Sequence, residues 1–146
     1  MAGKIIISAE TGSDITEELA REFGITLIPM HVSLGNETLD DGTFPPEDVC
    51  DYYNRTGKVP TTSGSTPYDF ESVYDPLFAA DPQLQILHLA YSAVTTCSYH
   101  SCELAIEKGA SRLPVMIQLL GYGGWLNGSV PFVKSNDMYT FTFLHR

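Results

Sequence analysis

The sequence predicts an α/β domain in which a mainly parallel sheet is flanked by helices. Short apolar runs at residues 4–8, 25–34 and 84–91 are typical of strands, and the first of them is rich in β-branched residues, as buried strands are. Stretches with apolar residues at helical spacing separate these runs. Strands that alternate with helices indicate parallel βαβ units, and such sheets bind ligands beyond the carboxyl ends of their strands.

The first strand and helix are predicted from residues 4–24. Lys4–Ser8 is the strand, and the polar stretch after it turns into a helix that Ser13 or Asp14 caps. Gly24 lies where a helix-ending glycine belongs. The helix carries one apolar stripe with a spacing of four, formed by Ile15, Leu19 and Phe23.

The next segment is predicted to hold one long strand, a loop and a helix. Residues 25–34 are expected to form a single second strand, and residues 36–43 an acidic loop. Pro45–Asp48 then opens a helix that continues through Tyr53. Gly57 is expected to end this helix.

The clearest helical pattern of the chain follows a hydroxyl-rich tract at residues 60–67. Thr66 is the expected N-cap, Pro67 suits the first helical position, and Asp69 lies in the first turn. The core-facing residues of this helix recur at i, i+3, i+4, i+7 and i+8, and they are Phe70, Val73, Tyr74, Leu77 and Phe78. A third strand at 84–91 and a helix at about 96–107 follow.

Length and composition indicate one cytoplasmic domain with a single core. The chain has 146 residues, 43% of them hydrophobic, and lacks a run of the roughly 18 to 20 apolar residues that a membrane span needs. No export signal is expected at the N-terminus. The net charge of −10 argues against nucleic acid as a partner. Three cysteines in expected helices, Cys50, Cys97 and Cys102, fit reduced thiols better than a disulfide framework.

The balance of acidic and basic residues changes near Lys108. Residues 1–107 hold 17 of the 18 acidic residues and four basic ones, whereas residues 108–146 hold one acidic and four basic ones. The stretch after Leu113 is apolar and interrupted by glycines, and its secondary structure does not follow from the pattern. We therefore expect a domain at 1–112 and a divergent tail at 113–146.

Hydroxyl side chains gather where the expected sheet would bind a ligand. Thr11 and Ser13 follow the first strand, and a group of three, Ser92, Thr95 and Thr96, follows the third strand. The side chains of Thr61, Thr62 and Ser63, with the amino end of the next helix, make a neutral, donor-rich pocket suited to a carboxylate. The alternative is an ordinary Ser/Thr-rich loop that caps a helix.

No complete catalytic or metal-binding motif is present. The spacing of Cys97, His100, Cys102 and His88 matches no zinc pattern, so neither a metal nor a cofactor is expected. Ser92 and His88 share a strand face about 13 Å apart at roughly 3.3 Å per residue, too far for a nucleophile and its base. Ser92 with His100 leaves a small-ester hydrolase as the alternative function.

Four segments in order, with matching spacing, resemble the N-terminal part of the DegV family of bacterial fatty-acid-binding proteins. These segments are 4–15, 28–35, 60–63 and 88–96, and the likeness extends over residues 3 to about 110. The family includes the lipid-carrying subunits of fatty acid kinase. The resemblance implies a DegV-like α/β domain that binds a long-chain fatty acid without turnover and presents it to a kinase partner.

The resemblance also implies the residues that bind the carboxylate. Thr62, with help from Thr61, would hold it together with Ser92 or a residue near it, such as Thr95. The Asp-Ser-x-x-Asp pattern of the family is replaced here by Glu10–Asp14, a conservative departure.

Family members are about twice as long and hold the acyl chain between two domains. A family strand that ends in Asp-Ser is replaced here by Pro114–Gln118. One set of codons for the last three of these residues, ATG-ATT-CAA, gives Asp-Ser when it is read two bases later. A frameshift near residue 110 would explain the tail, and a fragment without independent function is a further alternative.

Overall fold

The computed structural model describes residues 4–91, 96–108, 115–119, 133–135 and 138–143. Six strands form one sheet in the order β2-β1-β6-β7-β9-β8. They are β1 (Ile5–Glu10), β2 (Ile25–Ile28), β6 (Gln85–Tyr91), β7 (Val115–Leu119), β8 (Val133–Ser135) and β9 (Met138–Phe143). All neighbours pair in parallel except β8 and β9, which confirms the predicted α/β fold with a mainly parallel sheet.

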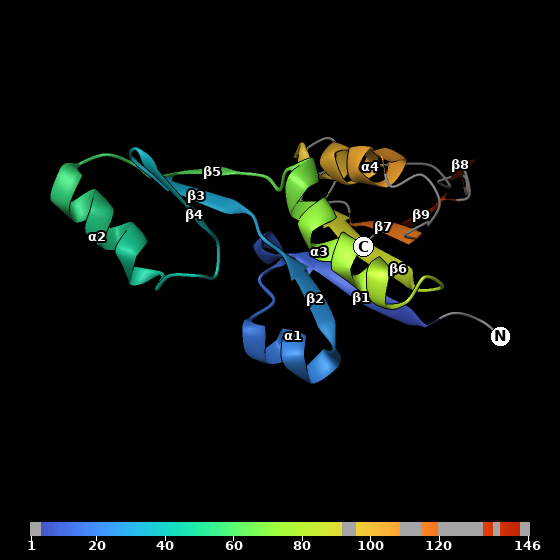
Figure 1. Ribbon diagram of the computed structural model, residues 1–146. Helices are drawn as coiled ribbons and strands as arrows, with labels where there is room; N and C mark the ends of the chain where they lie inside the picture. The colour runs from blue at the N-terminus through green and yellow to red at the C-terminus, as the bar shows by residue number, and fades with distance from the viewer. Residues whose placement is uncertain (1–3, 92–95, 109–114, 120–132, 136–137, 144–146) are drawn as a thin grey trace.

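The remaining elements are a second sheet and the helices. The second sheet has the order β4-β3-β5, with β3 (His31–Leu34), β4 (Glu37–Asp40) and β5 (Thr61–Ser63). The helices are α1 (Glu17–Phe23), α2 (Glu47–Thr56), α3 (Pro67–Ala80) and α4 (Ser98–Lys108), after a 3-10 turn at Thr11–Ser13. Figure 1 shows α3 and α4 together over the six-stranded sheet, while α2 and the three-stranded sheet project to one side.

The hydrophobic core lies between the six-stranded sheet and helices α3 and α4. Alternate residues of β6, Ile86 and Ala90 among them, face the core. The predicted face of α3 is confirmed, since Phe70 and Tyr74 are buried and the other three residues pack against the same cluster. Burial of an apolar side chain of this size contributes about 1.5 to 3 kcal/mol, so α3 is firmly fixed to the sheet.

The prediction of one strand at 25–34 is wrong. Pro29 and Met30 separate β2, which pairs with β1, from β3, which belongs to the other sheet. A proline has no amide hydrogen to donate, so it interrupts a strand ladder. The apolar residues continue on both sides of the break, with Ile28 buried in β2 and Val32 buried in β3, and periodicity alone therefore does not reveal it.

The acidic loop predicted at 36–43 contains a strand instead. Residues Glu37–Asp40 form β4, which pairs antiparallel with β3 across a two-residue turn at Gly35 and Asn36. Gly35 has φ +77°, the left-handed region that the first central residue of a type II′ hairpin turn needs. The chain was too polar here for a strand to be recognised, since Leu39 is the only apolar residue of β4.

The predicted cap of α1 is also wrong. Thr16 is the N-cap, and its hydroxyl accepts the amide hydrogen of Leu19, whereas the Ser13 hydroxyl donates to the Glu10 carbonyl. The chain first makes the 3-10 turn, and Asp14 ends that turn in the left-handed region. The stripe on α1 is exposed, with Leu19 43% and Phe23 66% accessible.

Both predicted glycine stops are confirmed, because Gly24 and Gly57 are left-handed C-caps of α1 and α2. Helix α2 extends beyond Tyr53 to Thr56. Cys50 and Cys102 lie within helices, whereas Cys97 lies just before α4. Strand β7 continues the six-stranded sheet from β6, and the proposed boundary at residue 112 stays a prediction.

The start of α3 is a complete capping box, as the sequence predicts. The Thr66 hydroxyl accepts the amide hydrogen of Asp69, and the Asp69 carboxylate accepts that of Thr66. Thr66→Val is expected to lower the free energy of unfolding by about 1 kcal/mol, measured by urea denaturation. Ser72→Ala on the exposed side of the same helix is the control, because its hydroxyl only contacts the Asp69 carbonyl. Equal losses in both variants would contradict the role of the cap.

A buried histidine gives the fold a second testable property. His88 is fully buried on β6, its Nδ1 lies 3.1 Å from the Ser8 hydroxyl, and burial lowers its pKa from 6.5 to about 4. Between these two values the unfolded chain binds a proton that the folded chain does not bind, so stability falls as the pH falls. At about 1.4 kcal/mol per pH unit, the loss from above pH 6.5 to pH 4 is about 3 kcal/mol.

The His88→Gln variant should lack this part of the pH dependence. Urea denaturation of both proteins at neutral pH and at about pH 4 measures it. For each protein, the free energy of unfolding at about pH 4 is subtracted from that at neutral pH, and these differences are compared. Any packing cost of glutamine then cancels. A wild-type protein that loses no more stability than the variant would show that His88 is not held neutral.

Candidate functional site

The hydroxyl tract forms an edge strand at the junction of the two sheets. β5 (Thr61–Ser63) pairs antiparallel with β3, so that Thr61 lies opposite Ser33, Thr62 opposite Val32, and Ser63 opposite His31. Strand β3 lies between β4 and β5, which leaves the outer edge of β5 unpaired within the described part of the chain. All three residues of β5 are exposed. Exposed hydroxyls beside open backbone donors suit a small anion.

The three-stranded sheet has one polar and one more apolar face. Residues directly opposite one another in an antiparallel pair share a face. The polar face therefore carries His31, Ser33, Thr38, Asp40, Thr61 and Ser63. The other face carries Val32, Leu34, Glu37, Leu39 and Thr62. The three hydroxyls predicted to form one pocket thus divide between the faces, and Thr62 stands alone among mainly apolar neighbours.

The end of the tract contacts the segment that follows β6. The amide of Ser65 donates to the Ser98 hydroxyl at 3.0 Å, and the Ser65 hydroxyl donates to the Pro29 carbonyl at 2.8 Å. A Cβ atom on Gly64 would clash with the Ser98 hydroxyl and lie 3.1 Å from that of Thr96. The predicted meeting of this tract with the segment after the third strand is therefore present at 64–65 and 96–98. Ser92 and Thr95 lie outside the described residues.

The amino end of α3 already holds a carboxylate of its own. One oxygen of Asp69 accepts the Thr66 amide hydrogen at 2.6 Å and the Thr66 hydroxyl hydrogen at 2.7 Å. Burial raises the pKa of Asp69, but the hydrogen bonds from Thr66 and then His31 outweigh it and hold the pKa below 3.8. Asp69 is therefore an anion at neutral pH. The predicted positive helix end is thus partly neutralised, so a ligand carboxylate would depend on β5 and its neighbours.

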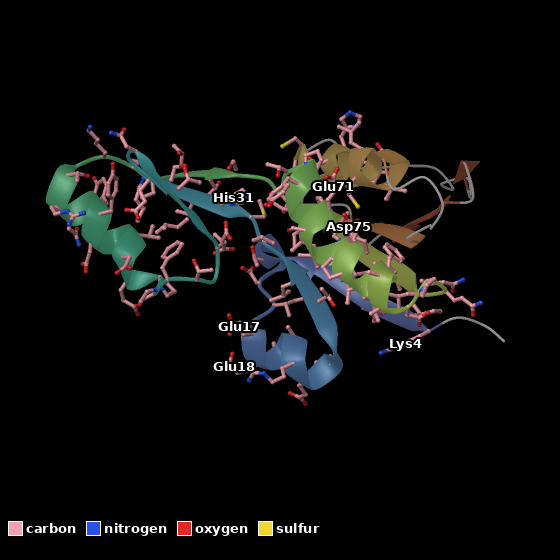
Figure 2. The ribbon with its side chains drawn as sticks, viewed as in Figure 1. Lys4, Glu17, Glu18, His31, Glu71 and Asp75 are labelled. Carbon is pink, nitrogen blue, oxygen red and sulfur yellow. The ribbon has the colours of Figure 1, made fainter. Side chains whose placement is uncertain are left out.

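His31 joins the polar face to α3, and the sequence reasoning missed it. Its Nε2 lies 2.9 Å from Asp69 and its Nδ1 3.0 Å from Asp40 of β4. Figure 2 shows His31 between β3 and the start of α3. Partial burial lowers the pKa of His31, but the attraction of Asp69 and then Asp40 outweighs it and raises the pKa above 6.5. The only signal in the sequence was a histidine within an alternating strand, which is too common to indicate a role.

The hydroxyls after β1 make local contacts. The Thr11 hydroxyl accepts the Met30 amide hydrogen at 3.0 Å, and the Ser13 hydroxyl donates to the Glu10 carbonyl at 2.6 Å. Deeper in the domain, the Ser8 hydroxyl contacts the Tyr74 hydroxyl at 2.8 Å. Burial raises the pKa of Tyr74 well above 10, so this phenol stays neutral. These groups stabilise the interior and the Pro29–Met30 segment between β2 and β3 rather than line the hydroxyl tract.

The residues considered for catalysis and metal binding lie apart in the described chain. His88 is buried against Ser8, whereas His100 is largely exposed on α4, with its Nδ1 3.3 Å from Glu103. Among the described residues, no group of three or more His, Cys, Asp or Glu side chains is placed to hold a metal ion. Within the same part of the chain, every helix is too short or too polar to cross a membrane.

Comparison with known proteins gives one consistent family. The model of the family described as uncharacterised DegV proteins matches residues 4–115. A DegV domain-containing protein of Caldanaerobacter subterraneus subsp. tengcongensis is 31% identical over 74 residues, which are 51% of this chain and 26% of that protein. Another, from Clostridium perfringens, is 23% identical over 93% of this chain and 49% of its own length. The chain thus spans less than half of the relatives that it matches.

Solved structures share the fold. A fatty-acid-binding DegV family protein from Thermus thermophilus superposes with a TM-score of 0.65 at 23% identity, over 79% of this chain and 40% of that one. A DegV lipid-binding protein from Thermotoga maritima gives a TM-score of 0.62 at 26% identity, over 77% of this chain and 40% of that one. The family match covers most of the sequence, and the fold agrees with it. The chain therefore belongs to the DegV family.

Proposed function

We propose that this chain is a fatty-acid-binding protein of the DegV type whose hydroxyl tract holds the lipid carboxylate. The observation that carries the proposal is the place of β5, an exposed edge strand of hydroxyl residues whose end contacts the segment after β6. Relatives with this fold are described as binding stearic acid in Eubacterium ventriosum and heptadecanoic acid in Eubacterium eligens. The ligand is then a long-chain fatty acid.

Thr62 is the residue on which the site depends most. Its side chain shares a face with Val32 and Leu39, so a hydroxyl donor lies next to apolar surface, as a lipid headgroup and its chain require. Thr61 and Ser63 lie on the opposite face of β5, and they assist through the strand edge rather than from the same side. Ser92 and Thr95 complete the proposed site from the segment after β6.

The protein is proposed to carry its ligand rather than transform it. A hydroxyl–carboxylate contact involves no bond cleavage. The two groups beside the tract that could accept a proton are already engaged, because Asp69 binds Thr66 and the ring nitrogens of His31 contact two carboxylates. A carrier needs a recipient, and a fatty acid kinase subunit in the cytoplasm is the partner that the family resemblance implies. The remaining wall for the acyl chain would come from a second domain, as in family members of twice this length.

The first test is native mass spectrometry of the purified protein. A bound fatty acid is expected as a mass increment that disappears after denaturation. Retention in a non-denaturing spectrum requires a slow dissociation rate, which burial of the acyl chain provides. Release of p-nitrophenol from short acyl esters, abolished by Ser92→Ala, would instead establish the hydrolase alternative. A protein with neither property would be a fragment without independent function.

The second test compares two threonines on opposite faces of one strand. Thr62→Val keeps the side-chain shape and removes the donor, and a hydrogen bond to a charged group contributes about 1.5 to 3 kcal/mol. The dissociation constant for stearic acid should rise about 10- to 150-fold, measured by isothermal titration calorimetry. Thr61→Val is the matched control and should cause a smaller loss. Unchanged affinity in Thr62→Val would mean that the carboxylate binds elsewhere.

A further inference from the structure

A charge-paired histidine lies directly beside the hydroxyl tract. His31 is the Cα partner of Ser63 in the β3–β5 ladder, so the two residues lie on the same face and about 4.5 to 5.5 Å apart. The imidazole is mostly buried, with 14% of its side chain exposed. Nothing in the proposed carboxylate site assigns it a role.

The hydrogen bonds of His31 require a particular protonation state. Each ring nitrogen lies within 3.0 Å of a carboxylate oxygen, Asp40 on one side and Asp69 on the other. A carboxylate accepts hydrogen bonds and donates none, so both nitrogens must carry a hydrogen. Neutral imidazole has one N–H and one lone pair, and it satisfies only one of the two contacts. The observed bridge is therefore that of the imidazolium cation.

This bridge connects three of the elements around the tract. Asp40 belongs to β4, His31 to β3, and Asp69 to the first turn of α3. The same oxygen of Asp69 accepts both hydrogens from Thr66, which is only three residues beyond the end of β5. The tract is thus held at its two ends by β3 and by a helix cap, and His31 joins these two supports.

The charge balance beside the tract depends on the same group. Asp40 and Asp69 are the charged side chains that contact the ring, and the strand opposite contributes the uncharged Ser63. With His31 protonated, one cation offsets two anions. Loss of the proton leaves two carboxylates without compensation on the sheet face opposite Thr62, and their mutual repulsion weakens the bridge that joins β3 to the start of α3.

We propose that protonated His31 is the positioning residue of the carboxylate site, and that fatty acid binding weakens when His31 loses its proton. This inference rests on the proposed function and adds a regulation to it. The raised pKa of His31, caused by Asp69 and Asp40 in spite of partial burial, fixes the direction. A group with a raised pKa stabilises the folded arrangement fully below pH 6.5, and this contribution is lost as the pH rises through its folded value.

The test is a pH profile of heptadecanoic acid binding by wild-type protein and His31→Gln. The wild-type protein should bind at least about fivefold more tightly at about pH 6 than at about pH 8.5. The variant should show little difference between the two, with an affinity like that of the wild type at the higher pH. The free fatty acid ionises in the same way in both experiments. Its contribution to the pH dependence therefore cancels when the two profiles are compared.

Two further variants separate positioning from simple loss of structure. Asp40→Asn leaves the ring with one carboxylate, so the wild-type transition should move to lower pH while affinity at low pH is largely kept. His31→Lys keeps a cation through this range and should remove the transition while it recovers part of the affinity. A profile that is the same in wild type and His31→Gln would overturn the inference and leave the proposed function intact.

A measurement on the ligand-free protein distinguishes failure of this inference from failure of the proposed function. Amide hydrogen exchange of residues 61–66, expressed as protection factors, should show protection that falls from about pH 6 to about pH 8.5 in the wild type and not in His31→Gln. If the wild type binds no fatty acid but shows this difference, the positioning role stands and the proposed function fails. Protection that does not depend on His31 would overturn the inference.

Discussion

The change of sheet at Pro29 and Met30 is the constraint on which the rest of the structure depends. Three groups from distant parts of the chain satisfy its backbone: Met30 donates to Thr11 and accepts from the Asp41 amide, and Pro29 accepts from Ser65. A buried peptide group without such partners costs about 1 to 3 kcal/mol. The crossover thereby joins the end of β1, the β3–β4 hairpin and the hydroxyl tract at one point. The tract lies where it does because the crossover needs the Ser65 hydroxyl.

The sequence predicted those features that follow from local chemistry. The core face of α3 follows from helical periodicity, and its Thr66 cap and the glycine ends of α1 and α2 rest on contacts within one turn; all are confirmed. The break after β2 and the hairpin partner of β3 depend on pairing between segments, which periodicity does not report. For the same reason the sequence predicted a site at the hydroxyl tract without predicting that its residues divide between two sheet faces. A strand of three polar residues does not stand out from a loop in the sequence.

The protein is acidic and its proposed ligand is an anion. The side chains close to the candidate site explain how the two are compatible. The overall charge of −10 repels a fatty acid anion weakly at a distance, because salt screens charges beyond about 10 Å. Close to β5, the hydroxyls are neutral, the charge of Asp69 is partly offset by its hydrogen bonds from Thr66 and by His31, and Thr62 faces apolar residues. The local field rather than the net charge therefore decides whether a carboxylate is accepted. The sequence did not indicate a role for His31, because its two partners, Asp40 and Asp69, come from other elements.

The exposed stripe of α1 has a consequence for the motion of the domain. Leu19 and Phe23 are largely accessible, and Ala20 is the only residue of the helix that is buried. A seven-residue helix is too short to be stable by its own hydrogen bonds, and little apolar surface holds this one to the sheet. Its free energy of local opening must then be far below that of global unfolding. We therefore expect helix α1 to open locally while the β1–β6 pair and α3 remain folded.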